Sequence, residues 1–98
     1  MSVTSSKNNN GAVTINIGEQ FTFESHHEFR DAYRDQPRNT NYVINLSKTT
    51  YMDSSALGML LLLREFNGEN NTIQITSCNE EISKIFEIAR FDKMFLIE

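Results

Sequence analysis

Residues 42–66 read YVINLSKTTYMDSSALGMLLLLREF, and this stretch decides the fold. Residues 42–46 are rich in β-forming side chains, whereas the run from Met59 to Phe66 favours a helix. Between the two runs lies Asp-Ser-Ser at 53–55. Asp and Ser begin helices because their side-chain oxygens accept hydrogen bonds from unpaired backbone N–H groups. We therefore predict a strand followed by a helix that starts at Ser54 or a neighbour, and the positive end of that helix favours an added phosphate.

On both sides of this stretch the apolar residues recur at strand or helix spacing. One more helix is expected from Ser25, with Glu28 completing a capping box, to a stop before Pro37. The helix from Ser54 should end at Gly68. A third helix, capped by Asn79, should pack an apolar stripe on the core, formed by Ile82, Ile85, Phe86 and Ala89. The expected strands are residues 12–17, 21–23, 42–46, 72–76 and 94–97, the second of which could pair with the first.

This alternation of strands and helices predicts an α/β fold with a mixed, mostly parallel β-sheet flanked by α-helices. Residues 1–11 are mostly polar with little to bury, so we expect a disordered N-terminal arm followed by one domain over residues 12–98. The 98 residues carry a net charge of −4, which argues against nucleic acid and an anionic membrane surface as partners. The chain shows no secretory signal, no apolar run long enough to span a bilayer and only one cysteine, so a cytoplasmic location is the expectation.

Three segments carry a resemblance to a known family. They are residues 45–47 (NLS), 51–58 (YMDSSALG) and 85–95 (IFEIARFDKMF). Together they resemble the STAS domain and, more narrowly, the single-domain anti-sigma factor antagonists. The resemblance runs from about Ala12 to the C-terminus, and it implies the STAS fold for that part of the chain.

The resemblance also implies a cycle of partner switching. In the family, a serine kinase of histidine-kinase-like fold, often itself the anti-sigma factor, phosphorylates the serine that follows the aspartate, which is Ser54 here. A metal-dependent serine phosphatase removes the phosphate. The unmodified antagonist binds the kinase-type partner and frees what that partner restrains. Members with a similar helix are often tied to biofilm or motility output, so transcription regulation is the expected setting.

Two positions depart from the family pattern. Ala56 stands where the family commonly has Gly, and Thr22 stands where it often has an acidic residue that helps to contact the partner, with Glu24 two residues on. We predict a docking surface around Ser54 that consists of Asp53, Ser55, Ala56, Leu57, Met59, Thr22 and Glu24.

The helix after Ser54 is apolar on nearly every side, so part of it should face solvent or a partner. One possible face holds Leu57, Leu60 and Leu61, together with the stem of Arg64. The other holds Met59, Leu62, Leu63 and Phe66. The pattern does not decide which of the two faces packs on the sheet.

Other functions have less support in the sequence. Asp53, Ser54 and Ser55 are also what plain helix capping requires, and the main alternative is a non-switching STAS scaffold or a subunit of a larger signalling or transport assembly. An enzyme is not expected, because the Gly-x-Ser-x-Gly pattern is absent and the only histidines, His26 and His27, lie in the first expected helix. Adjacent helical histidines diverge, so we expect surface residues there and no metal or cofactor. Cys78 is expected in the core at a strand end.

Overall fold

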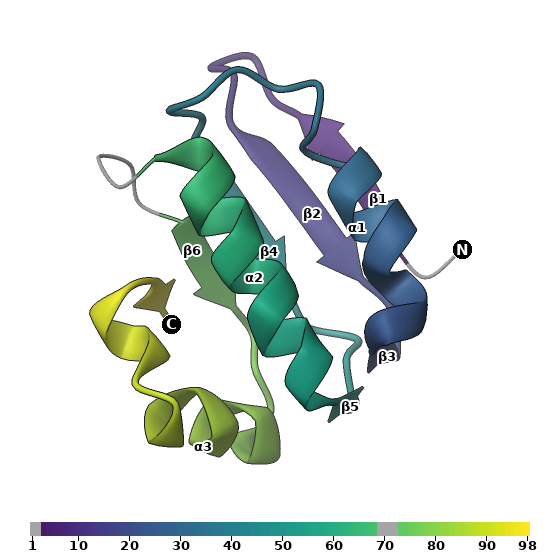
Figure 1. Ribbon diagram of the computed structural model, residues 1–98, viewed down its shortest axis with the longest axis vertical. Helices are drawn as coiled ribbons and strands as arrows, with labels where there is room; N and C mark the ends of the chain where they lie inside the picture. Colours follow the sequence, from purple (N-terminus) through teal and green to yellow (C-terminus); the bar gives the residue numbers. More distant parts are fainter. Residues whose placement is uncertain (1–2, 69–72) are drawn as a thin grey trace.

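The computed structural model describes residues 3–68 and 73–98, which form one layer of strands with helices packed against it (Figure 1). The strands are β1 (Val3–Lys7), β2 (Val13–Ile17), β3 (Gln20–Phe21), β4 (Tyr42–Asn45), β5 (Tyr51–Met52), β6 (Ile73–Thr76) and β7 (Leu96–Ile97). The helices are α1 (His26–Asp31), α2 (Ser54–Asn67) and α3 (Glu80–Ile88), with short 3-10 turns η1 (Phe23–Ser25) and η2 (Phe91–Lys93). Helices α1 and α2 lie side by side in front of the sheet.

The main sheet has the order β1-β2-β4-β6-β7. Only the β1–β2 pair is antiparallel, and the three pairs that follow are parallel. Ile15 pairs with Ile44 and Ile44 with Ile75, and all three side chains are fully buried. The prediction of a mixed, mostly parallel sheet flanked by helices is confirmed.

The expectation of a disordered arm over residues 1–11 is wrong for Val3–Lys7, which form β1. Val3 is buried and the other four residues are exposed, so the segment has the polar composition that suggested disorder. An edge strand is held mainly by backbone hydrogen bonds, which composition does not reveal. Asn8 closes the turn into β2, because its Oδ1 accepts hydrogen bonds from the N–H groups of Asn10 and Ala12, at 2.9 and 3.0 Å.

The segment before α1 also differs from expectation. β3 pairs in parallel with β5, in a separate two-stranded sheet, and not with β2. Thr22 caps the turn η1 through a hydrogen bond from the N–H of Glu24, at 3.3 Å. Ser25 is buried and makes no capping bond, because its hydroxyl lies 3.4 Å from the carbonyl oxygen of Gln20 and donates to it. The predicted capping box at Ser25 is therefore wrong, whereas the helix does stop before Pro37.

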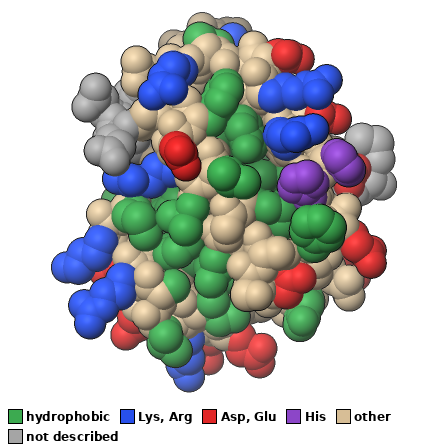
Figure 2. Space-filling model, viewed as in Figure 1, with side chains coloured by type: hydrophobic (Ala, Val, Ile, Leu, Met, Phe, Trp, Pro, Cys, Tyr) green, Lys and Arg blue, Asp and Glu red, His purple; other side chains and the backbone are tan. Residues whose placement is uncertain are grey.

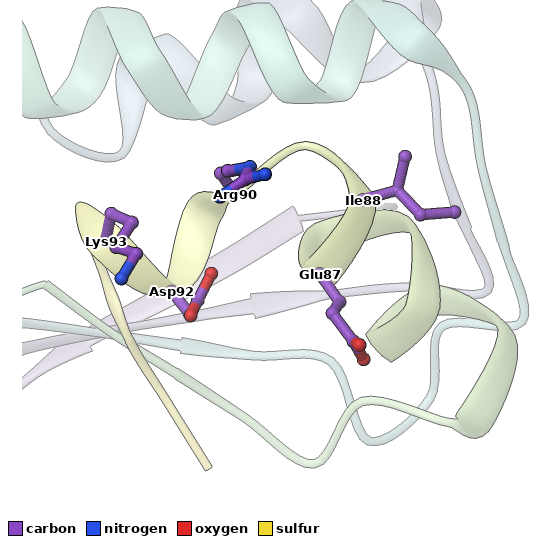
Figure 3. A pocket seen from close by; sticks show the side chains of 5 residues that line it. All are labelled: Glu87, Ile88, Arg90, Asp92 and Lys93. Carbon is purple, nitrogen blue, oxygen red and sulfur yellow. The ribbon is translucent and has the colours of Figure 1, made fainter.

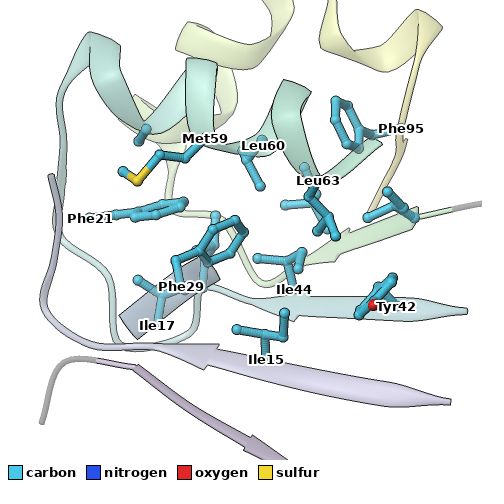
Figure 4. Packing of buried hydrophobic residues seen from close by; sticks show 14 of the residues in the cluster. Ile15, Ile17, Phe21, Phe29, Tyr42, Ile44, Met59, Leu60, Leu63 and Phe95 are labelled. Atoms are coloured by element: carbon cyan, nitrogen blue, oxygen red, sulfur yellow. The ribbon is translucent and has the colours of Figure 1, made fainter. Parts of the chain in front are cut away.

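The core lies between the sheet and the helices, as the close view in Figure 4 shows. Helix α2 contributes a buried stripe made up of Ala56, Met59, Leu60, Leu63 and Asn67. Neither of the two faces proposed from the sequence is correct, since this stripe takes Leu60 from one and Met59 and Leu63 from the other. Leu61 and Leu62 are exposed instead, and Leu57 and Phe66 are half-buried.

The ends of the later helices follow the predictions. Gly68 ends α2 with a φ of 93°, in the region that favours glycine. Asn79 caps α3, with its Oδ1 2.8 Å from the N–H of Ile82. All four residues of the predicted α3 stripe pack on the core, with Ile82 and Phe86 buried and Ile85 and Ala89 partly buried. The predicted strand residue Thr72 lies outside the described residues.

Asn67 joins the end of α2 to the loop before β4. Its Oδ1 accepts a hydrogen bond from the N–H of Thr40 at 2.8 Å, and its Nδ2 donates to the Thr40 carbonyl at 2.7 Å. The backbone carbonyl of Asn67 also accepts from the N–H of Asn39 at 2.9 Å. Because Asn67 is fully buried, these bonds satisfy polar groups that would otherwise be left without water.

Candidate functional site

The candidate site is the start of α2, where three consecutive polar residues have different roles. Asp53 is the N-cap, and its Oδ1 accepts hydrogen bonds from the N–H of Ala56 at 3.2 Å and from the hydroxyl of Ser55 at 2.5 Å. Ser54 is the first residue of the helix and is exposed. Its hydroxyl has no hydrogen-bond partner among the residues that the structure describes. Of these three residues, therefore, only Ser54 has an exposed hydroxyl that makes no hydrogen bond to the described residues.

Hydrogen bonding lowers the pKa of the Asp53 carboxyl below its ordinary value. The bond from the Ser55 hydroxyl is the largest cause, desolvation opposes it as the second largest, and the backbone N–H groups of Ala56, Phe23 and Ser55 each lower the pKa further. Asp53 is thus held as a carboxylate at neutral pH. A fixed negative charge stands directly before Ser54, at the helix end that stabilises it.

The segment before α1 is held against this helix start by backbone contacts. β3 and β5 pair through Gln20 with Tyr51 and Phe21 with Met52, and the N–H of Asp53 donates to the carbonyl of Phe21 at 3.3 Å. Thr22 and Glu24 follow directly after β3. Thr22 is half-buried and Glu24 is exposed. The small β3–β5 sheet therefore brings two sequence segments about 30 residues apart to one site.

The structure sorts the predicted docking residues into two groups. Ala56 is fully buried and Met59 is 5% exposed, so, contrary to the prediction, their side chains pack in the core and do not line the surface around Ser54. Both belong to the stripe of α2 that packs on the sheet. The others reach the surface around Ser54 at least in part, and they are Asp53, Ser55, Leu57, Thr22 and Glu24.

Sequence reasoning missed two aromatic residues at this site. Phe23 is 67% exposed and Tyr51 is 55% exposed, although large aromatic side chains are usually buried. Tyr51 precedes the Asp-Ser-Ser segment by two positions. Phe23 lies in η1, and its own backbone N–H donates a hydrogen bond to the Asp53 carboxylate. Leu61 and Leu62 continue the apolar surface along α2. Figure 2 shows hydrophobic side chains spread over this face of the molecule.

The histidines and the cysteine lie outside this group of polar residues. His26 stacks on Phe23, with ring centroids 5.3 Å apart and an angle of 10° between the planes, and His27 is exposed. Cys78 follows β6 and packs partly on the core, where burial raises the pKa of its thiol. No cluster of three or more His, Cys, Asp or Glu side chains suited to a metal occurs within residues 3–68 and 73–98. None of the helices in these ranges is both long and apolar enough to cross a membrane.

A separate hollow of about 420 Å³ lies where α3 meets η2 (Figure 3). Its charged lining has both signs, with Glu87 and Asp92 set against Arg90 and Lys93. Ile88, which also lines it, is 83% exposed. Because the opposite charges balance, this hollow offers no net attraction for an ion of either sign.

Comparisons with known proteins agree on one family. The model for "Mlab, STAS domain" matches residues 5–98. Over 89 residues the chain is 47% identical to a STAS-domain containing protein of Pseudomonas aeruginosa (strain UCBPP-PA14), covering 87% of this chain and 86% of that protein.

Two solved structures share the fold. One is a candidate anti-sigma factor antagonist of Thermotoga maritima, with a TM-score of 0.74 and 17% identity, covering 97% of this chain and 84% of that one. The other is a Shewanella loihica PV-4 protein with a SpoIIAA-like fold, with a TM-score of 0.58 and 10% identity, covering 98% of this chain and 82% of that one.

Proposed function

The chain belongs to the STAS domain family, and from this premise we propose that it is a partner-switching regulator, similar to anti-sigma factor antagonists, that is controlled by reversible phosphorylation of Ser54. One observation carries the proposal. Ser54 is exposed at the start of α2 with an uncommitted hydroxyl, while its neighbours Asp53 and Ser55 are bonded to each other. The alternative role of Ser54, capping of the helix, is already filled by Asp53.

In the proposed cycle the unmodified protein binds a serine kinase of histidine-kinase-like fold, of the anti-sigma factor kind. A metal-dependent serine phosphatase reverses the modification. The kinase and the phosphatase supply the catalysis, so this chain contributes a substrate serine and no cofactor. We place the cycle in the cytoplasm, with an output in transcription, biofilm formation or motility.

A phosphate on Ser54 would change binding more than it changes the fold. It adds close to two negative charges, and the N-terminus of α2 can accommodate them because its N–H groups and dipole favour anions. The surface around it is a mixture of Asp53, Glu24 and the exposed rings of Phe23 and Tyr51. Burying a phosphate there against a partner would require desolvation next to existing carboxylates, which opposes binding.

The first test is intact mass and peptide mapping of the native protein, purified from cells in two growth states. The proposal expects one phosphoryl group on Ser54, with an occupancy that changes between the states. Immobilised Ser54→Ala should retain the partner that the unmodified wild type retains, and Ser54→Glu should lose it. Ser83→Glu serves as the matched control, because Ser83 is an exposed serine on α3.

The opposite result is equally informative. If no state carries phosphate and Ser54→Glu retains every partner, the switching function is refuted. Ser54 would then be part of a helix start, and a non-switching STAS scaffold or subunit would be the better description.

A further inference from the structure

A second surface lies at the other end of α2, between that helix and the α1 region. It is a shallow hollow of about 560 Å³, which we call the arginine hollow, and it is bordered by Arg30, Arg34 and Arg38. These are three of the nine Lys and Arg residues of a chain whose net charge is −4. Among the described residues, Glu65 is the one acidic residue in its lining. The charge of the hollow is therefore opposite to that of the molecule as a whole.

The floor of the arginine hollow is aromatic and apolar. Tyr33, in the turn after α1, and Phe66 of α2 lie with ring centroids 5.3 Å apart, and Leu62, which is 54% exposed, completes the floor. Tyr33 also packs edge-on against the core residue Phe29, at 5.7 Å. The floor is thus an extension of the core that reaches the surface, and Figure 2 shows hydrophobic side chains with Lys or Arg on both sides in the upper half of this face.

The three arginines come from different positions and converge on this floor. Arg30 and Arg34 are one helical turn apart. Arg38 comes from the loop before β4, and its Nη2 lies 3.3 Å from the position that a Cβ on Gly68 would occupy. A side chain at residue 68 would therefore crowd this guanidinium, and glycine leaves it room.

Of the three arginines, only Arg34 has a carboxylate at ion-pair distance within the described residues. Arg34 forms an ion pair with Asp31 at 3.5 Å, and both side chains are more than half exposed. Neither Arg30 nor Arg38 has a carboxylate at ion-pair distance in residues 3–68 or 73–98. A guanidinium binds carboxylates in a planar, two-pronged geometry, so the site is suited to an acidic ligand that also carries an apolar group.

We propose that the arginine hollow is a docking site for an acidic segment of a partner protein. The segment would place an aromatic or aliphatic side chain on Tyr33 and Phe66, and its Asp or Glu carboxylates on Arg30, Arg34 and Arg38. Ser54 lies near one end of α2 and this site at the other, on a helix about 20 Å long. We therefore expect docking here to be separate from the switch proposed for Ser54.

The test uses a fluorescein-labelled peptide with a central Phe-Leu pair and three Asp or Glu residues on each side. Fluorescence anisotropy gives its affinity at low and high salt, and amide chemical shifts in NMR spectra locate it on the protein. The variant R30Q/R34Q/R38Q removes the proposed contacts. The control K7Q/K48Q/K84Q changes the net charge by the same amount at exposed residues elsewhere.

We expect binding to wild type and to the control, and a loss of about tenfold in affinity in the arginine variant. The same peptide with Gln and Asn in place of its acidic residues, or with Ala-Ala in place of Phe-Leu, should bind about tenfold more weakly. Shifts should concentrate on the lining of the arginine hollow, and Ser54→Glu should bind the peptide like wild type.

Several results would overturn the proposal. They are no binding of the acidic peptide, an equal loss of affinity in both triple variants, and shifts centred on the start of α2. Shifts of the same lining residues by inorganic phosphate or ATP, with affinity above that of the peptide, would make the hollow a small-anion site. If wild type dimerises in analytical ultracentrifugation and the arginine variant does not, the hollow binds a second copy of the chain.

Discussion

At the scale of single residues, two roles are divided among the three polar residues at the start of α2: Asp53 and Ser55 stabilise the helix start, and Ser54 exposes its hydroxyl. Asp53 and Ser55 bond to each other, and Asp53 also bonds the N–H of Ala56, so both side chains are committed to the local structure. Ser54 lies between them without such a bond in the described part of the chain. A change at Ser54 should therefore affect recognition, and a change at its neighbours should affect folding.

Ser54→Ala and Ser55→Ala form a matched pair that measures this separation. We expect Ser55→Ala to lower the free energy of unfolding by about 0.5–1.5 kcal/mol, because it removes the hydrogen bond to Asp53. Ser54→Ala should change it by less than about 0.5 kcal/mol. Urea denaturation followed by circular dichroism measures both. Equal losses in the two variants would mean that the Ser54 hydroxyl also supports the helix.

The lowered pKa of Asp53 predicts a pH dependence with a defined sign. A carboxyl whose pKa is lower in the folded state stabilises the fold above its unfolded pKa, about 3.9, and loses that contribution as the pH falls through the folded value. Asp53→Asn removes this titration, so the free energy of unfolding of the variant should fall less steeply than that of wild type on acidification through this range. Urea denaturation at a series of acidic pH values measures the difference.

The exposed Asp35 provides the control for that experiment, since Asp35→Asn removes a carboxylate from the surface without removing a helix cap. The two variants should have different slopes below pH about 4. Identical slopes would show that the acid sensitivity reflects net charge and not the bonds that Asp53 makes.

At the scale of the element, α2 serves two surfaces. Its inner stripe belongs to the core, and its outer side carries Leu61, Leu62 and Gly58, all exposed. The sequence predicted both ends of this helix but not which of its faces is buried. Apolar residues lie on nearly every side of the helix, so their spacing does not mark one apolar face. The orientation is set by the sheet, whose strands come from distant parts of the chain. For this reason Ala56 and Met59 were assigned to the docking surface and are in fact buried.

Gly58 lies within α2, and, apart from its chain neighbours and the backbone of the same helix, a Cβ built on it meets no described heavy atom within 4 Å. Glycine inside a helix is about 0.5–1 kcal/mol less favourable than alanine. We therefore expect Gly58→Ala to raise the free energy of unfolding by about that amount and, by adding a methyl group to the proposed docking side, to weaken partner retention. Thermal or urea unfolding measures the first effect, and partner retention on the immobilised protein the second.

Ser83→Ala, at an exposed position of α3, is the control for a general gain in helix propensity. It should stabilise the protein slightly and leave partner retention unchanged. If Gly58→Ala also leaves partner retention unchanged, the docking surface does not extend along α2 past Leu57.

At the scale of the whole molecule, the sheet was largely predictable and its edge was not. The alternation in residues 12–17 and 72–76 and the run at 42–46 mark central strands, because their apolar side chains must enter the core. β1 lacks that signal, since only Val3 enters the core. The pairing of β3 with β5 was missed for a similar reason, because two residues on each side are too few to show a period.

Deleting residues 1–7 tests the contribution of β1. The deletion removes the buried Val3 side chain and the antiparallel ladder with β2, so the free energy of unfolding should fall by about 2–4 kcal/mol. It also exposes the edge of β2, which should increase self-association in light scattering. The control T4A/S6A changes only exposed side chains and should stay within about 0.5 kcal/mol of wild type. Full stability of the deleted protein would show that the segment is dispensable.

The position of β1 also bears on the order in which the chain folds. β1 and β2 are joined by a tight turn, whereas each parallel pair of the main sheet needs a connection long enough to cross over it. A hairpin closes in about 1–10 μs, and long-range pairings wait for the closure of larger loops. During synthesis β1 and β2 leave the ribosome before β4 does, so we expect them to pair before β4 emerges and to offer it a preformed edge. The segment that looked least structured in the sequence would then be among the earliest to acquire structure.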